Sequence, residues 1–94
     1  MYERAVHLTV TGRVQGVGYR AWAERESLAL GLDGWVRNRR DGSVEALVAG
    51  TAEAVGAFIA AAWDGPPAAR VDAVVTQEGA GPPVDPGFRV LPTR

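Results

Sequence analysis

The chain has 94 residues, enough for one compact domain and too few for two, so we expect a single domain over residues 1–94. Ten Arg and no Lys stand against 11 Asp plus Glu, and the formal net charge of −1 provides no global basic field for nucleic acid. The absence of Cys excludes a disulfide framework, a thiolate nucleophile and a Cys-based metal site. No segment has the length of a membrane span and the N-terminus lacks the apolar core of a signal peptide, so we expect a cytoplasmic protein without a membrane partner. A chain of this length can bury one adequate core by itself, so we expect a monomer.

The N-terminal part of the chain reads as a strand, a turn and a helix. Alternating apolar residues from Ala5 to Thr11 predict a strand with one buried face. After a glycine-rich turn, good helix formers from Arg20 to Leu30 predict a helix that Gly31 ends. The side expected to be buried carries Tyr19, Ala23, Ser27 and Leu30. The residues expected to point outward are Glu24, Arg25 and Glu26.

The middle of the chain reads as a hairpin followed by a second helix. Strands are predicted from Leu32 to Asn38 and from Ser43 to Ala49, and Asp41-Gly42 between them is a strong signal for an antiparallel hairpin. Thr51 is a suitable N-cap for the next helix, which Gly65-Pro66-Pro67 ends. Its apolar residues are spaced for burial against a sheet: Val55, Phe58, Ile59 and Ala62.

Two more strands complete the predicted fold. Alternation of Val71, Ala73 and Val75 predicts a fourth strand with one buried face. After a loop rich in Gly and Pro, a short terminal strand is predicted from Phe88 to Leu91. The order β-α-β-β-α-β plus a short C-terminal edge strand indicates a ferredoxin-like α+β fold, an α/β sandwich with an antiparallel sheet and two helices on one face.

The glycine-rich turn is the first candidate site. Gly12, Gly16 and Gly18 lie where a strand passes into a helix, and glycine permits the backbone conformations in which several N–H groups converge on one anion. The helix N-terminus adds free N–H donors, and Arg20 supplies a planar cation that can bind phosphate oxygens with two hydrogen bonds. The segment from Gly12 to Arg20 therefore predicts a backbone cradle for a phosphate group, against the alternative of a simple connector with a solvated Arg20.

Two familiar nucleotide motifs do not explain this turn. The mononucleotide loop requires a Lys followed by Ser or Thr, and the chain has neither there. Residues Gly16 to Ala21 match the dinucleotide pattern G-x-G-x-x-A, but the Asp41-Gly42 hairpin is incompatible with the repeated parallel crossovers of a dinucleotide fold. The predicted ligand is therefore a single phosphoryl group.

A second motif runs from Gly34 to Asn38, at the end of the second predicted strand. In the split β-α-β arrangement the first two strands point the same way, so Asn38 and the cradle are expected at the same edge of the sheet. Taken alone, an Asn next to a turn is usually only a turn former. Its position beside the cradle makes it a candidate for contact with the same ligand.

Together the segments from Gly12 to Arg20 and from Gly34 to Val44 resemble the two signature motifs of the acylphosphatase family. Further similarity runs from Gly65 to Val71 and through the Phe88 strand, so the resemblance covers essentially the whole chain. Tyr19 stands where many members of the family have Phe. Similar domains also occur at the N-terminus of larger hydrogenase-maturation proteins that handle carbamoyl phosphate.

The resemblance implies an enzyme that hydrolyses the mixed anhydride of a carboxylate and phosphate, with a small-molecule acyl phosphate as substrate and neither metal nor cofactor. It implies that Asn38 orients the attacking water and that Arg20 and the preceding loop hold the phosphoryl group. The residues implied to bind phosphate are Gln15, Gly16, Val17, Gly18, Tyr19 and Arg20.

Two other functions remain to be weighed. A non-catalytic phosphate- or anion-binding module would use the same cradle, although it would not need a water-orienting Asn38. An RNA-binding domain has the same element order but needs stacking aromatic residues on its central strands, where this chain offers His7, Thr9 and Glu45, so we expect no nucleic-acid partner.

Several further residues are expected to be structural. His7 lies in a strand and is expected to be a surface or structural residue rather than a catalytic one. The basic residues near the hairpin, expected to be solvated or to steer phosphorylated ligands, are Arg37, Arg39 and Arg40. The aromatic residues expected to pack are Trp22, Trp35, Trp63 and Phe58.

Overall fold

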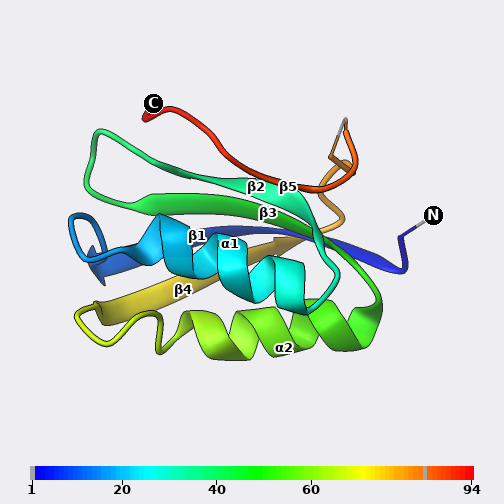
Figure 1. Ribbon diagram of the computed structural model, residues 1–94, viewed down its shortest axis with the longest axis horizontal. Helices are drawn as coiled ribbons and strands as arrows, with labels where there is room; N and C mark the ends of the chain where they lie inside the picture. Colours follow the sequence, from blue (N-terminus) through cyan, green and yellow to red (C-terminus); the bar gives the residue numbers. More distant parts are fainter. Residues whose placement is uncertain (1, 84) are drawn as a thin grey trace.

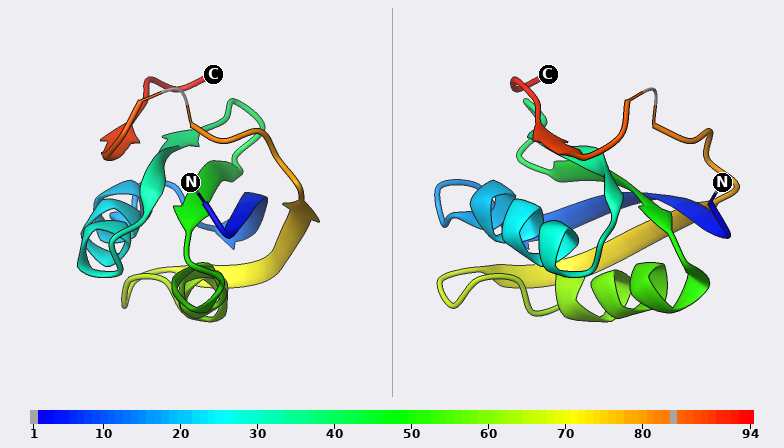
Figure 2. Two further views of the ribbon diagram at one scale, coloured as in Figure 1. Left: turned by 90° about the vertical axis from the view of Figure 1, so that its right-hand side faces the viewer. Right: turned by 45° about the vertical axis from the view of Figure 1, so that its right-hand side comes forward.

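The structure, a computed structural model, describes residues 2–83 and 85–94. Two helices pack on one face of a five-stranded sheet whose strand order is β4-β1-β3-β2-β5 (Figures 1 and 2). The elements in chain order are β1 (Arg4–Arg13), α1 (Tyr19–Ala29), β2 (Asp33–Asn38), β3 (Val44–Gly50), α2 (Ala52–Ala62), β4 (Arg70–Glu78) and β5 (Phe88–Val90). The ferredoxin-like α+β architecture expected from the sequence is confirmed.

The pairing of the strands is antiparallel except at one edge. β3 pairs antiparallel with both β1 and β2, so β1 and β2 run in the same direction. β5, however, pairs parallel with β2, so the sheet is mixed rather than wholly antiparallel. β4 lies at one edge of the sheet and β5 at the other (Figure 1).

The expected alternation along β4 is wrong. The pairing of β1 with β4 shifts register between Thr11 and Gly12, which leaves Asp72 as an extra residue on β4. Such a bulge changes the phase of the side chains along the strand. Val74 therefore packs against the core opposite Val10, whereas Val75 is 61% exposed.

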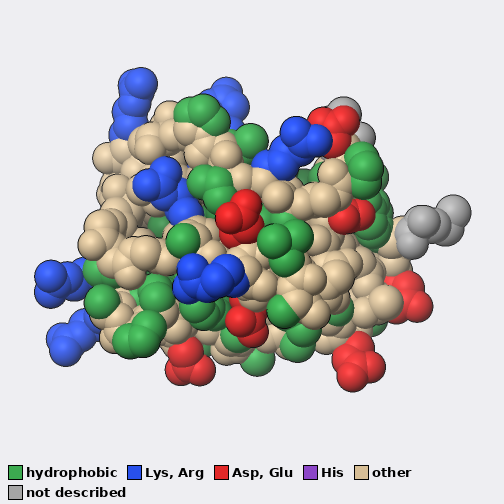
Figure 3. Space-filling model, viewed as in Figure 1, with side chains coloured by type: hydrophobic (Ala, Val, Ile, Leu, Met, Phe, Trp, Pro, Cys, Tyr) green, Lys and Arg blue, Asp and Glu red, His purple; other side chains and the backbone are tan. Residues whose placement is uncertain are grey.

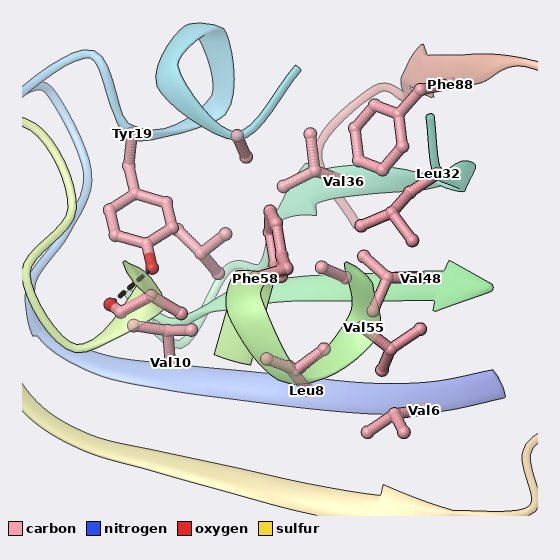
Figure 4. Packing of buried hydrophobic residues seen from close by; sticks show 14 of the residues in the cluster. Val6, Leu8, Val10, Tyr19, Leu32, Val36, Val48, Val55, Phe58 and Phe88 are labelled. Carbon is pink, nitrogen blue, oxygen red and sulfur yellow. Dashed lines mark hydrogen bonds between the residues drawn. The ribbon is translucent and has the colours of Figure 1, made fainter. Parts of the chain in front are cut away.

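The core lies between the two helices and the sheet, and residues from both layers fill it (Figure 4). Phe58 of α2 is 1% exposed at its centre, and Trp22 of α1 packs between Tyr19 and Phe58. The expected N-cap is confirmed, because Thr51 Oγ1 accepts a hydrogen bond from the Ala54 N–H at 3.1 Å. The expectation that Trp63 packs is wrong: it is the C-cap of α2 and is 50% exposed.

Candidate active site

The segment between β1 and α1 is shorter than the sequence suggested. β1 continues to Arg13, so Gly12 lies in the strand and is not part of the anion-binding loop. Its φ is +118°, and a Cβ there would lie 2.3 Å from the Arg70 carbonyl oxygen. Gly12 is therefore required by the close approach of β1 to β4, and residues 14–18 alone form the loop.

The other two glycines shape the start of α1. Gly16 and Gly18 have φ of 72° and 85°, in the left-handed region that favours glycine, and Gly18 is the N-cap. No side chain caps the helix, and its first turn contains no acidic residue. Within the described residues, no carbonyl or side chain accepts a hydrogen bond from the backbone N–H groups of residues 15–21. Free donors and the positive end of the helix dipole make this a site for an anion.

A hollow of about 350 Å³ lies in front of this helix N-terminus, and we call it the α1 hollow. Both α1 and β2 contribute to it, because α1 begins where β2 ends, at the same end of the molecule (Figure 1). It therefore brings Arg20 and Asn38 together, as the sequence predicted. The lining residues are Val14, Gly16, Gly18, Tyr19, Arg20, Ala21, Glu24, Asn38 and Val90.

Asn38 is held by its backbone and leaves its side chain available. It is the last residue of β2 and pairs with Val44 of β3, while its carbonyl oxygen accepts a hydrogen bond from the Arg94 N–H at 3.0 Å. Among the described residues, its side-chain amide has no hydrogen-bond partner, and Arg20 takes part in no ion pair. Both groups are thus free to contact a ligand in the α1 hollow.

Three of the residues predicted to bind phosphate use their side chains elsewhere. Gln15 Nε2 donates to the carbonyl oxygens of Arg39 and Ser43 at 2.6 and 2.8 Å. Val17 packs against the core. The Tyr19 hydroxyl donates to the Ala62 carbonyl oxygen at 2.7 Å (Figure 4), and burial raises its pKa far above the ordinary value. Only the backbone N–H groups of these residues are available for an anion.

Three lining residues were missed by the sequence reasoning: Ala21, Glu24 and Val90. Glu24 was expected to point outward, yet it is half-buried and lines the α1 hollow. The signal was present in its spacing, since residues four apart share a helix face and Arg20 is four positions earlier. Val90 reaches the hollow because β5 lies beside β2, a pairing that the sequence pattern did not indicate.

The remaining candidates form a cluster around Glu45. His7 Nε2 and Arg37 Nε each lie 2.7 Å from a Glu45 carboxylate oxygen, and Arg39 Nη1 lies at 3.2 Å. Burial raises the pKa of Glu45, but the hydrogen bonds from Arg37, His7 and Arg39 outweigh it and lower that pKa to about 2. Arg37 and Arg39 are therefore paired, which corrects the expectation that they are solvated. None of the four lines the α1 hollow.

The distribution of charge favours anionic ligands at this end of the molecule. Figure 3 shows Arg side chains concentrated toward the end where α1 begins, with Asp and Glu mainly toward the opposite end and the lower rim. A local field of this kind attracts anions even when the net charge is −1. Within residues 2–83 and 85–94, no three His, Asp or Glu side chains gather in a way that could hold a metal ion. The described helices include none long and apolar enough to cross a membrane.

On this ferredoxin-like fold, a helix N-terminus without a side-chain cap, an Arg and an Asn line one hollow, an arrangement suited to a protein that binds small anions. The acylphosphatase family model matches residues 6–90. Acylphosphatases from Azoarcus sp. and Nitrobacter hamburgensis are 59% and 55% identical, each over 92% of this chain and over 87% and 92% of their own lengths. The crystal structure of acylphosphatase from Bacillus subtilis superposes with a TM-score of 0.89 at 34% identity, covering 94% of this chain and 98% of that one. The chain belongs to the acylphosphatase family and is an acylphosphatase, a hydrolase.

Proposed function

We propose that this acylphosphatase hydrolyses the carboxyl–phosphate anhydride bond of small acyl phosphates in the α1 hollow, without a metal ion or cofactor. The observation that supports the proposal is that Arg20, the uncapped start of α1 and Asn38 line one hollow. In this scheme Arg20 and the backbone N–H groups of residues 15–19 bind the phosphoryl oxygens. Asn38 orients the attacking water from the end of β2.

The reaction forms one bond to phosphorus and breaks another. The water oxygen attacks phosphorus, the bond from phosphorus to the acyl oxygen breaks, and the carboxylate leaves with the bonding electron pair. Because the Asn38 amide is neither acid nor base near neutral pH, it can only hydrogen-bond, and the water's proton passes to the substrate phosphate. A kcat profile that required an enzyme group titrating near neutrality would contradict this proton route.

The reaction requires little from the protein beyond positioning of the substrate and stabilisation of the charge on the phosphoryl oxygens. A carboxylate is a good leaving group, so a strong nucleophile is unnecessary and the transition state depends on fixed donors around the phosphoryl oxygens. Single donors of this kind contribute roughly 10²- to 10³-fold in rate. Arg20, with no ion-pair partner in the described part of the chain, is free to act in this way.

The test is release of inorganic phosphate from benzoyl phosphate, with and without a chelator, by the wild type, Asn38→Ala and Gln77→Ala. Gln77 is exposed on β4 and serves as the matched control. We expect chelator to leave the rate unchanged, and Asn38→Ala to lower kcat by roughly 10²-fold while keeping the inhibition constant for phosphate. Loss of activity with chelator, or full activity of Asn38→Ala, would refute the proposal. Binding of phosphate without hydrolysis by the wild type would instead favour the non-catalytic anion-binding module.

The proposal extends to a monomer in the cytoplasm that binds no nucleic acid. Sedimentation at assay concentration checks the oligomeric state, and fractionation of the source cells checks the location. Retention of the protein on single-stranded RNA at physiological salt would contradict the proposal that it binds no nucleic acid.

A further inference from the structure

The α1 hollow extends beyond the place where phosphate is expected. Arg20 and Asn38 mark its outer end, at the start of α1 and the end of β2. Glu24 is four residues further along α1, a helix rise of about 6 Å. Val90 pairs with Val36, two residues before Asn38, which is about 7 Å back along the strand.

These two displacements have the same direction. α1 runs away from the end of the molecule at which β2 finishes, so moving from Arg20 to Glu24 and from Asn38 to Val36 both lead inward (Figure 1). Glu24 and Val90 therefore form the inner end of the hollow, with Ala21 between Glu24 and Arg20 in sequence. A substrate with its phosphoryl group at the outer end extends its acyl group toward this inner end.

Glu24 gives the inner end its charge. It is the one acidic residue among those that line the hollow, and no ion pair in residues 2–83 and 85–94 includes it. Its companions there, Ala21 and Val90, are apolar and cannot offset a carboxylate. An acyl group at this position meets a carboxylate that no ion pair of the described residues holds, across a partly solvated gap.

We infer that Glu24 determines which acyl groups the enzyme accepts, favouring uncharged or cationic acyl groups and rejecting those with a second carboxylate. The inference rests on the proposed function, since it takes the phosphoryl group to lie beside Arg20. Repulsion between Glu24 and the phosphate itself is common to all substrates. Selectivity therefore arises only from the charge on the acyl side.

The test uses three ring substrates that differ in charge at one position: benzoyl phosphate, 4-carboxybenzoyl phosphate and 4-(aminomethyl)benzoyl phosphate. Each kcat/KM is divided by that for benzoyl phosphate, and the ratios are compared between the wild type and Glu24→Gln, so that intrinsic substrate reactivity cancels. For unit charges about 6–7 Å apart in a largely aqueous gap, we expect Glu24→Gln to raise the carboxy ratio about 3- to 10-fold. The aminomethyl ratio should fall by a similar factor, and 1 M salt should reduce both changes.

Glu26→Gln is the matched control. Glu26 is also a half-buried glutamate of α1, but it does not line the α1 hollow. The same loss of one negative charge there should leave both ratios unchanged to within about 1.5-fold, because Glu26 lies outside the α1 hollow and its charge is screened from the substrate.

Two results would overturn the inference in an active enzyme. Unchanged ratios in Glu24→Gln would mean that Glu24 does not interact with the acyl group. An equal fall in kcat/KM for all three substrates would mean that Glu24 acts by positioning Arg20 instead. Failure of the wild type to hydrolyse benzoyl phosphate is a different result, because it would refute the proposed function itself.

Discussion

Gln15 Nε2 donates a hydrogen bond to the Arg39 carbonyl oxygen at 2.6 Å, which joins the anion-binding loop to the residue that directly follows Asn38. The same nitrogen donates to the Ser43 carbonyl oxygen at 2.8 Å, on the other side of the β2–β3 turn. One side chain thus fixes the distance between the proposed phosphate site and the residue proposed to orient water. Such a link places reacting groups that lie far apart in the sequence.

Gln15→Ala should therefore impair catalysis through position rather than through lost contact with substrate. It removes two hydrogen bonds worth about 1 kcal/mol each, so we expect unfolding free energy to fall by about 1–2 kcal/mol. We expect kcat to fall about 10-fold, with a smaller change in KM, because Asn38 and the loop lose their common anchor. Urea unfolding and steady-state kinetics measure the two effects.

Gln77→Ala makes the same change of side chain at an exposed position of β4 and should be neutral in both measurements. If Gln15→Ala lost stability but kept the wild-type kcat, the link would be structural only.

Arg20 should be sensitive to the shape of its side chain as well as its charge. Arg20→Ala is expected to weaken inhibition by phosphate and to lower kcat/KM by roughly 10²- to 10³-fold. Arg20→Lys keeps the charge but loses the planar two-bond geometry, so its kcat/KM should lie between that of the wild type and that of Arg20→Ala. Phosphate inhibition and kcat/KM of the folded variants are the measurements. Equal activity of Arg20→Lys and the wild type would argue against bidentate binding of the phosphoryl group.

Alanine substitutions at Gly12 and Gly18 of the first motif should differ in how much they lower the stability of the fold. Alanine at Gly18 meets no atom within 4 Å, so its cost is the left-handed backbone alone, about 1–2 kcal/mol. Alanine at Gly12 would place Cβ 2.3 Å from the Arg70 carbonyl oxygen and force β1 and β4 apart. We expect Gly12→Ala to be the more destabilising by at least about 1 kcal/mol in urea unfolding. Equal losses would mean that the β1–β4 contact yields more easily than the backbone geometry implies.

The Glu45 cluster should make the stability of the fold depend on pH in the acid range. The pKa of Glu45 in the folded protein is about 2, below its ordinary value of 4.5. The contribution of Glu45 to the free energy of unfolding is therefore complete above pH 4.5 and is lost as the pH falls through about 2. Protonation of the carboxylate removes the acceptor for Arg37, His7 and Arg39.

Glu45→Gln isolates this contribution from that of other carboxylates. At pH 7 we expect the variant to be less stable than the wild type by about 1–3 kcal/mol, since charge-assisted hydrogen bonds are lost. The difference should shrink steadily between pH 4.5 and 2. Urea titrations of both proteins across this range measure it, and a difference that stayed constant down to pH 2 would contradict the assigned pKa.

The sequence alone was sufficient wherever the determining contacts are local. Period-two spacing predicted β1 and β3, helical spacing predicted both helices, Asp41-Gly42 predicted the hairpin, and Thr51 predicted the start of α2. The two family motifs predicted that Arg20 and Asn38 share one site, and both line the α1 hollow. The strands, helices, hairpin and cap depend on turn chemistry and side-chain periodicity, which neighbouring residues determine, whereas the shared site was expected from the element order and the family resemblance.

Only the tertiary structure decided which long-range partner each residue meets. The bulge at Asp72 changed which side chains of β4 face the core, so that Val75 is exposed. Gly12 lies where the backbones of β1 and β4 approach closely. The packing of α1 beside β2 and β5 placed Glu24 on the lining of the α1 hollow. Such outcomes depend on strand register and on how a helix packs on the sheet, which involve residues far apart in the chain; the four-residue spacing of Arg20 and Glu24 shows that they share a helix face but not what that face meets.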